Sequence, residues 1–369
     1  MNMKKYLILA VVALVASAAC TKVESTVEAP DRAIAFQVAN YVPQTKAGEV
    51  KFDEAKSFYT YAWFHPETGA AQAFMTNETI KWQTTTNQWA ADRTYFWPKT
   101  GYVNFFSYAG TPVPVVTDGS ATYTGKTIAI TDDAMLASAA YRYASANSDS
   151  NVYGLQYGAS NTDVKGVPTL FHHLLSQVTV IVKFDASDVA DTKNKWDLTV
   201  NSLALSYKNT GSLTVTFTDP TTTGQAWPFG SAAYNWTPSA DPNTALNATV
   251  TASVGAVQTT VAPNVSAGLT FFDAVTVLPQ DLTAATGSDA SIALNYTLKH
   301  YYNDVEQIYE TVNLPAIKLT DFTVESINAW NMNYKYTYTI TIKPNKTVTF
   351  DPAVEPWQEK AAGYTYPNN

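Results

Sequence analysis

Strict alternation of apolar and polar residues recurs along this chain, and it predicts β-strands that each have one buried face. The clearest run is 334–342, where Tyr and Ile residues alternate with Lys and Thr. Similar runs occupy 178–184, 213–217 and 292–298, and the last of them continues to residue 302. Asn, Asp, Gly and Pro residues are frequent between these runs, as is typical of turns. We therefore expect many short antiparallel strands.

Helical patterns are scarce by comparison. Only 133–144 and 169–176 have a pattern that would suit a short helix. Many strands without alternating helices favour antiparallel β-sandwiches over a parallel βαβ sheet. The predicted fold class is therefore all-β, with few short helices.

The length of 369 residues suits two domains of about 150 residues each. A stretch rich in Gly, Ser, Asn and Pro near 158–168 is the candidate boundary. We expect an N-terminal β-sandwich over 33–165 and a C-terminal β-sandwich over 166–369.

The N-terminus has the residue order of a secretory signal. Lys4 and Lys5 are followed by an apolar run at 6–15 and then by small residues that lead to Cys20. The apolar run is shorter than the roughly 20 residues that span a bilayer. We expect residues 1–19 to be a signal peptide.

Cys20 is the only cysteine, so the chain can form no internal disulfide, and the thiol calls for another role. Its position after two alanines resembles a bacterial lipobox, although Ser17 stands where Leu is usual. The resemblance implies an acylated N-terminal cysteine, with 20–32 as a polar tether to the first folded element. The alternative is a plain signal peptide whose cleavage falls nearby.

The charge balance argues against nucleic-acid binding. The formal charge is −8, and loss of Lys4 and Lys5 makes it −8 − 2 = −10. Such an acidic surface repels phosphate groups. The aromatic share of 13% and the abundance of Thr and Tyr agree with a strand-rich chain.

No group of residues predicts catalysis, a cofactor or a metal. His172 and His173 are adjacent, and neighbours in a strand point to opposite faces, so they do not readily share a metal ion. Nucleophile-elbow, phosphate-loop and dinucleotide motifs are absent from the sequence. Trp82 and Trp89 flank a polar turn and could stack on sugar rings, but tryptophans are more often part of a core. We expect a protein that is not an enzyme.

Taken in order, four sets of segments resemble the fimbrillin family, which comprises the fimbrillin-like or Mfa-like subunits of type V pili. They are 33–36 with 44–47, 95–98 with 103–108, 170–178, and 330–342 with 354–357. The resemblance implies two transthyretin-like β-sandwich domains and no cofactor. It also implies export as a lipoprotein of the outer membrane and cell surface, and trimming by a trypsin-like protease.

The resemblance further implies polymerisation with other pilus subunits by strand exchange, with adhesion to a ligand on a host or bacterial surface. The chain would then lie in a pilus after processing. Stalk, tip and anchor roles all remain open. The alternative, from a different functional class, is a lipid-anchored glycan-binding protein of a nutrient-uptake system.

Ile34, Phe36 and Val38 share one face of the expected first strand. The resemblance implies that proteolysis removes this strand, residues 33–46, and opens a slot for a donor strand. The family pattern has Thr-Arg-Ala at the cut, and the matching residues here place Lys46 between Thr and Ala. Lys46 is the preferred cut, and Arg32 is the alternative, although a cut there would leave the strand in place.

The candidate donor strand lies near the C-terminus. Val348 and Phe350 alternate on one face, and Trp357 follows. These residues would suit the apolar face of a donor strand. They would suit an ordinary last strand of the second domain equally well.

Overall fold

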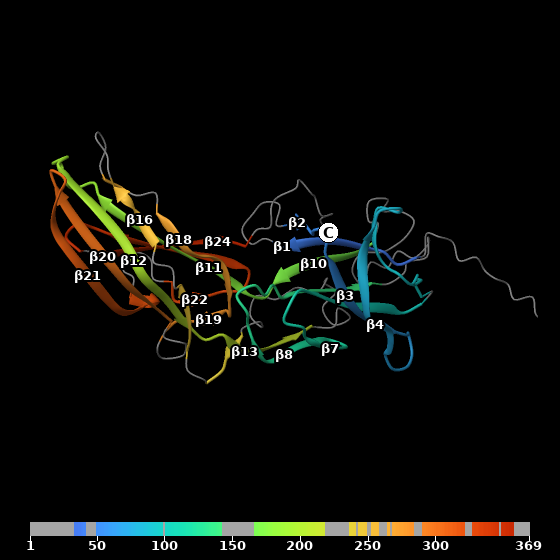
Figure 1. Ribbon diagram of the computed structural model, residues 1–369. Helices are drawn as coiled ribbons and strands as arrows, with labels where there is room; N and C mark the ends of the chain where they lie inside the picture. The colour runs from blue at the N-terminus through green and yellow to red at the C-terminus, as the bar shows by residue number, and fades with distance from the viewer. Residues whose placement is uncertain are drawn as a thin grey trace, which may run out of the picture.

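The computed structural model describes residues 33–41, 49–98, 100–141, 166–217, 236–240, 243–248, 252–257, 264–265, 268–283, 290–321, 327–346 and 348–357. Strands make up most of these ranges, which confirms the all-β class. Within them the only helical element is a single 3-10 turn, η2 (Leu319–Asp321). Figure 1 shows the strands gathered into two bodies, with the early strands at one end and most of the late strands at the other.

The first body is a sheet that curls until its ends meet. Its strands run in the order β10-β9-β6-β3-β4-β5-β1-β2, and an additional pairing between β1 and β10 closes all but β2 into a barrel. The strands are β1 (Phe36–Tyr41), β2 (Glu49–Lys51), β3 (Ser57–His65), β4 (Gln72–Gln83), β5 (Gln88–Ala91), β6 (Tyr102–Ala109), β9 (Met135–Tyr141) and β10 (Val167–His173). Aromatic side chains fill the interior, among them Phe36, Phe58, Phe105 and Phe171.

The second body is a sandwich of two antiparallel-rich sheets around one apolar core. One sheet has the order β17-β11-β23-β24, with β18 also pairing with β11; the other has the order β15-β12-β20-β21, with β16 also pairing with β12. The first comprises β11 (Ser176–Ala186), β17 (Asn264–Val265), β18 (Leu269–Val277), β23 (Tyr334–Ile342) and β24 (Val348–Pro356). The second comprises β12 (Asn194–Tyr207), β15 (Thr244–Ala248), β16 (Ala252–Val257), β20 (Ser291–Tyr302) and β21 (Val305–Lys318).

A smaller sheet joins the two halves of the chain. Its order is β14-β13-β8-β7, so β8 from the first half pairs with β13 from the second. The strands are β7 (Val115–Thr117), β8 (Ser120–Thr127), β13 (Thr210–Thr216) and β14 (Thr237–Pro238). Beside this sheet, β19 (Gln280–Asp281) and β22 (Ala329–Trp330) pair as a separate two-stranded ribbon. Tyr123 and Val215 of this sheet belong to the same apolar cluster as Phe106 and Leu136 of the barrel. Each half of the chain therefore contributes to this shared core.

All four alternating runs are strands, as the sequence predicts. The run at 334–342 coincides with β23, and those at 178–184 and 292–298 lie within β11 and β20. The run at 213–217 lies in β13 except for its last residue. In β11 buried and half-buried residues alternate throughout, as expected for a strand with one face in a core.

The two short helices expected at 133–144 and 169–176 are wrong, because the structure has β9 and β10 there. β9 pairs with β6 on one side and with β10 on the other. Local preference is a weak guide when neighbouring strands on both sides satisfy the backbone hydrogen bonds of a segment. The Ala-rich sequence of β9 is such a segment.

Strand pairing runs across the boundary expected at 165/166. β10 pairs with β1 and β9 of the barrel, and the chain enters the second sandwich only at β11. Leu174 and Leu175, between β10 and β11, are buried in the shared core. We propose these two residues as the point of division between the domains.

A first prediction concerns the shared core. The Tyr123 hydroxyl is buried and has no hydrogen-bond partner among the described residues, and burial raises its pKa. We expect Tyr123→Phe to leave the free energy of unfolding unchanged or to raise it by about 1 kcal/mol, because it removes an unpaired buried polar group.

The matched variant is Leu213→Ala in the same cluster. We expect it to lower the free energy of unfolding by roughly 2–5 kcal/mol, because it leaves a cavity. Urea unfolding measures both changes. A loss above about 1 kcal/mol for Tyr123→Phe would contradict the prediction.

Candidate functional site

The first strand, β1, occupies the place where the barrel closes (Figure 1). It pairs in parallel with β10, from Phe36 opposite Val167 to Asn40 opposite Phe171. It also pairs with β2 in antiparallel fashion and meets β5 at one residue pair, between Phe36 and Trp89. The Ile34 amide donates to the Tyr95 carbonyl at 2.8 Å. Backbone contacts thus hold β1 on both sides.

Ile34, Phe36 and Val38 point into the barrel, with exposed fractions of 5%, 3% and 3%. The Phe36 ring makes edge contacts with the rings of Phe58 and Phe105, each at a centroid distance of 5.7 Å. Burying each large apolar side chain contributes roughly 1.5–3 kcal/mol. These three side chains therefore make β1 and the residues just before it an integral part of the barrel core.

Gly166 allows the close approach of β1 to the start of β10. A Cβ at this glycine would lie 2.8 Å from the Ala35 carbonyl oxygen. The Val167 amide donates to that same oxygen at 2.7 Å. A larger residue at 166 would push the two segments apart and break this hydrogen bond.

Tyr95 stands beside the entry of β1 into the barrel. Its hydroxyl donates to a Glu78 carboxylate oxygen at 2.6 Å, and the ring packs against the barrel core. Burial, together with this hydrogen bond, raises the pKa of the Tyr95 hydroxyl. The hydroxyl therefore stays protonated and can keep donating across the neutral pH range.

Three of the predicted site residues lie outside the described residues. They are Cys20, Arg32 and Lys46. Along the chain, Lys46 falls in 42–48, the segment that connects β1 to β2. A cut there would separate β1 from the rest of the polypeptide.

The candidate donor residues belong to β24 and the residue after it. β24 is the terminal strand of its sheet and pairs with β23 along its whole length. Val348 packs at the margin of the second core, whereas the side chain of Phe350 lies outside the described set. Trp357 is 4% exposed and belongs to the core shared by the two halves. In this structure β24 is thus the last strand of the second sandwich.

Trp357 contacts the barrel through His173, at the end of β10. The two rings stack with centroids 4.3 Å apart and planes 10° apart. His173 is fully buried, and its Nδ1 lies 2.6 Å from Oδ1 of Asp133. This arrangement gives His173 a structural role, and its neighbour His172 faces the other side of the strand.

Trp82 and Trp89 form a cross-strand pair of β4 and β5, with ring centroids 5.8 Å apart. Trp89 is 3% exposed and lies in the barrel core, and Trp82 packs against that core. Trp89 is therefore part of the core, and the half-buried Trp82 packs against it.

The described ranges contain no group of three or more His, Cys, Asp or Glu residues placed to hold a metal ion. No helix in the described part of the chain has the length and apolar character that a membrane crossing needs.

A family model described as fimbrillin-like matches residues 45–357. The chain belongs to the fimbrillin-like family. No curated protein matches this fimbrillin-like chain in sequence.

Three solved structures are similar to the fimbrillin-like chain. A fimbrial protein from Bacteroides vulgatus is 16% identical, with a TM-score of 0.49 over 89% of this chain and 100% of that one. A cell adhesion candidate from Bacteroides uniformis is 16% identical, with a TM-score of 0.43 over 90% of this chain and 100% of that one. The fimbrial anchor protein Mfa2 from Porphyromonas gingivalis is 9% identical, with a TM-score of 0.27 over 88% of this chain and 98% of that one. The family match carries the assignment.

Sequence reasoning did not identify the partners of β1. The pairing of β1 with β10 joins segments far apart in the chain, and the alternating pattern of a strand does not name its neighbour. Gly166 carried a signal, because a glycine just before a strand often marks a close backbone approach. No local sequence pattern indicated that His173 stacks on Trp357.

A second prediction tests how much β1 contributes to the barrel. We expect Phe36→Ala to lower the free energy of unfolding of the intact chain by roughly 3–5 kcal/mol, because it leaves a cavity among Phe58 and Phe105. The control is Val354→Ala on β24, where the side chain is 50% exposed and a change below about 0.5 kcal/mol is expected. Denaturant unfolding measures both. Equal effects of the two substitutions would show that β1 adds little to the core.

Proposed function

We propose that this fimbrillin-like chain is a structural subunit, or an accessory tip or anchor component, of a cell-surface pilus, and that strand exchange assembles it. The observation that carries the proposal is the place of β1 in the barrel. β1 and the residues just before it are joined to their neighbours by backbone pairing and by three buried side chains, Ile34, Phe36 and Val38. It can therefore be replaced by another strand with the same alternation.

Loss of β1 would leave β10 with an unpaired edge and an apolar slot beside it. Such an edge is a template for pairing with a strand from another chain. Main-chain hydrogen bonds would supply affinity, and alternate side chains would supply register. A donor strand that refills the three apolar positions would recover roughly 1.5–3 kcal/mol for each.

We propose Lys46 as the processing site. It lies in the connection from β1 to β2, so cleavage there frees β1 from the chain that follows. Cleavage at Arg32 would leave β1 attached to the barrel through that connection. A protease that accepts lysine is therefore the one that opens the slot.

The proposed donor is β24, with Val348, Phe350 and Trp357 as its apolar residues. Its position at the end of a sheet supports this choice, because an edge strand detaches with the loss of one neighbour only. Burial of Trp357 against His173 would have to be given up on release. The proposed exchange therefore requires that the slot of the next subunit bury at least as much apolar surface.

We propose export by the signal peptide over 1–19 and anchoring to the outer membrane through acylated Cys20. Each buried lipid methylene contributes about 0.8 kcal/mol, and more than one acyl chain is needed for stable anchoring. The proposed partners are other pilus subunits, the membrane and a surface ligand. We further propose that the chain is not an enzyme. The glycan-binding alternative draws no support from Trp82 and Trp89, which pack in or against the barrel core.

A third prediction tests processing and assembly together. We expect limited digestion of the full chain with a trypsin-like protease to give a new N-terminus at residue 47 and ladders that resist mild denaturation. Lys46→Gln should abolish both, and Lys46→Arg should retain both, because the arginine restores a cleavable bond. N-terminal sequencing and gel electrophoresis measure the outcome.

Lys51→Gln, in β2 on the far side of the connection, is the matched control and should behave as the unmodified chain. A peptide of residues 33–42, added in excess, should suppress the ladder by refilling the slot. Cleavage after Lys46 without ladders, or ladders that the peptide leaves intact, would overturn strand exchange.

A fourth prediction concerns the anchor. We expect expression in a bacterium that processes lipoproteins, with a labelled fatty acid, to label the full chain. Cys20→Ser should abolish the label and release the protein from the membrane fraction, because an acyl chain needs the thiol. A labelled Cys20→Ser variant, or an unlabelled parent protein, would leave the plain signal peptide as the explanation.

A further inference from the structure

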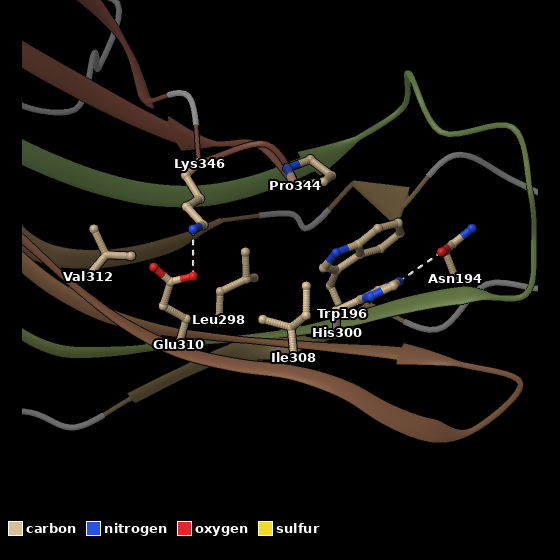
Figure 2. A pocket seen from close by; sticks show the side chains of 9 residues that line it. All are labelled: Asn194, Trp196, Leu298, His300, Ile308, Glu310, Val312, Pro344 and Lys346. Carbon is tan, nitrogen blue, oxygen red and sulfur yellow. Dashed lines mark hydrogen bonds and ion pairs between the residues drawn. The ribbon is translucent and has the colours of Figure 1, made fainter.

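The second sandwich has a pocket where the first residues of β12, the last residues of β20 and the first half of β21 meet the turn between β23 and β24. Its volume is about 190 Å³. β12, β20 and β21 supply a cross-strand row in which Trp196 pairs with His300, and His300 pairs with Ile308. Pro344 and Lys346 approach from the turn between β23 and β24, on the opposite sheet (Figure 2).

The polar groups at the two ends of the pocket satisfy one another. At one end the Lys346 ammonium lies 2.5 Å from a Glu310 carboxylate oxygen. At the other, Nε2 of His300 lies 2.8 Å from the side-chain oxygen of Asn194. Figure 2 shows the apolar side chains of Leu298 and Ile308 between these two ends. A neutral guest therefore suits this pocket better than an ion does, because it need not displace the ion pair.

The volume suits a single ring. A dry apolar cavity of about 150 Å³ is large enough for benzene. The pocket is somewhat larger, and Trp196 and Leu298 at its base are each 6% exposed. An aromatic side chain would fill it and remove this remaining apolar surface from water.

The strand beside the pocket has a free edge within the described residues. β21 ends its sheet and pairs there only with β20. Three of its large apolar side chains are exposed, namely Val305 at 61%, Ile308 at 53% and Tyr309 at 60%. Exposed apolar side chains on an unpaired edge strand are typical of an interaction site.

We propose that this pocket receives an aromatic side chain from an extended polypeptide partner, which pairs with the free edge of β21. Alternate residues of an added strand point to the same face of the sheet, so one of them can enter the pocket while the backbone pairs. The site is distinct from the β1 slot, and it requires neither cleavage at Lys46 nor release of β24.

The aromatic neighbours of Trp196 favour a side chain over a sugar. The His300 ring stacks on Trp196 at 5.1 Å, and the Phe184 ring packs against it at 5.9 Å. A pyranose ring binds to an open aromatic face, whereas the His300 ring already stacks on Trp196, and only 6% of Trp196 is exposed. This small exposed part of Trp196 remains to contact a guest.

The test uses the full chain and two fluorescently labelled probe peptides, acetyl-Thr-Thr-Phe-Thr-Thr-amide and its Ala equivalent. Fluorescence anisotropy measures binding. We expect the Phe peptide to bind at least about tenfold more tightly than the Ala peptide, because only the phenyl ring fills the pocket. Free indole should compete with the Phe peptide, and methyl β-D-glucopyranoside should not.

Ile308→Trp is the blocking variant, since its own indole would occupy the pocket. It should remove the difference between the two peptides. The matched control is Val305→Trp, which adds the same side chain to β21 outside the pocket lining and should keep the tenfold difference. Circular dichroism should show that both variants retain the strand content of the parent chain.

Equal binding of the two peptides to the parent chain would overturn the proposal. So would a tenfold difference that survives Ile308→Trp, because the phenyl ring would then bind elsewhere. Displacement of the Phe peptide by the glucoside would assign the pocket to a saccharide instead.

Discussion

The pairing of β1 with β10 is the contact on which the barrel depends. It closes the sheet, and it places Ile34, Phe36 and Val38 in the interior. The strands on either side of β1 would otherwise carry unpaired backbone groups, which are costly wherever water cannot reach them. One segment thus supplies both the last backbone partner and three apolar side chains of the barrel core. Its removal would open the backbone edge and the apolar slot together.

β10 connects this closing strand to the C-terminal end of the fold. Its backbone pairs with β1, and its last residue, His173, stacks on Trp357 just beyond β24. The shared core formed by β8 and β13 lies on the outer side of the barrel and ties the two halves of the chain together. The strand proposed to leave and the residue that follows the proposed donor strand therefore both contact β10. In the intact chain each is held by buried aromatic contacts.

Local pattern was a reliable guide where a strand has one buried face. β11 and β23 alternate in sequence as they alternate in burial, so their positions followed directly from the residues. The pattern was misleading for β9 and β10, where it suggested short helices and the structure has strands. β9 is rich in alanine and has strands on both sides, and their hydrogen bonds outweigh its local preference for a helix. The apolar face of β1 was predictable for the same reason as that of β11.

The sequence alone determined the all-β class, the family resemblance and the apolar face of the first strand, because alternation and ordered motifs are local properties. Only the tertiary structure decided which strands become neighbours. The parallel partner of β1, the closed barrel and the stacking of Trp357 on His173 all join residues distant in the chain. So does the pocket beside β21, which forms where one sheet meets the turn between β23 and β24. A strand pattern specifies which face is buried but leaves open which backbone lies beside it.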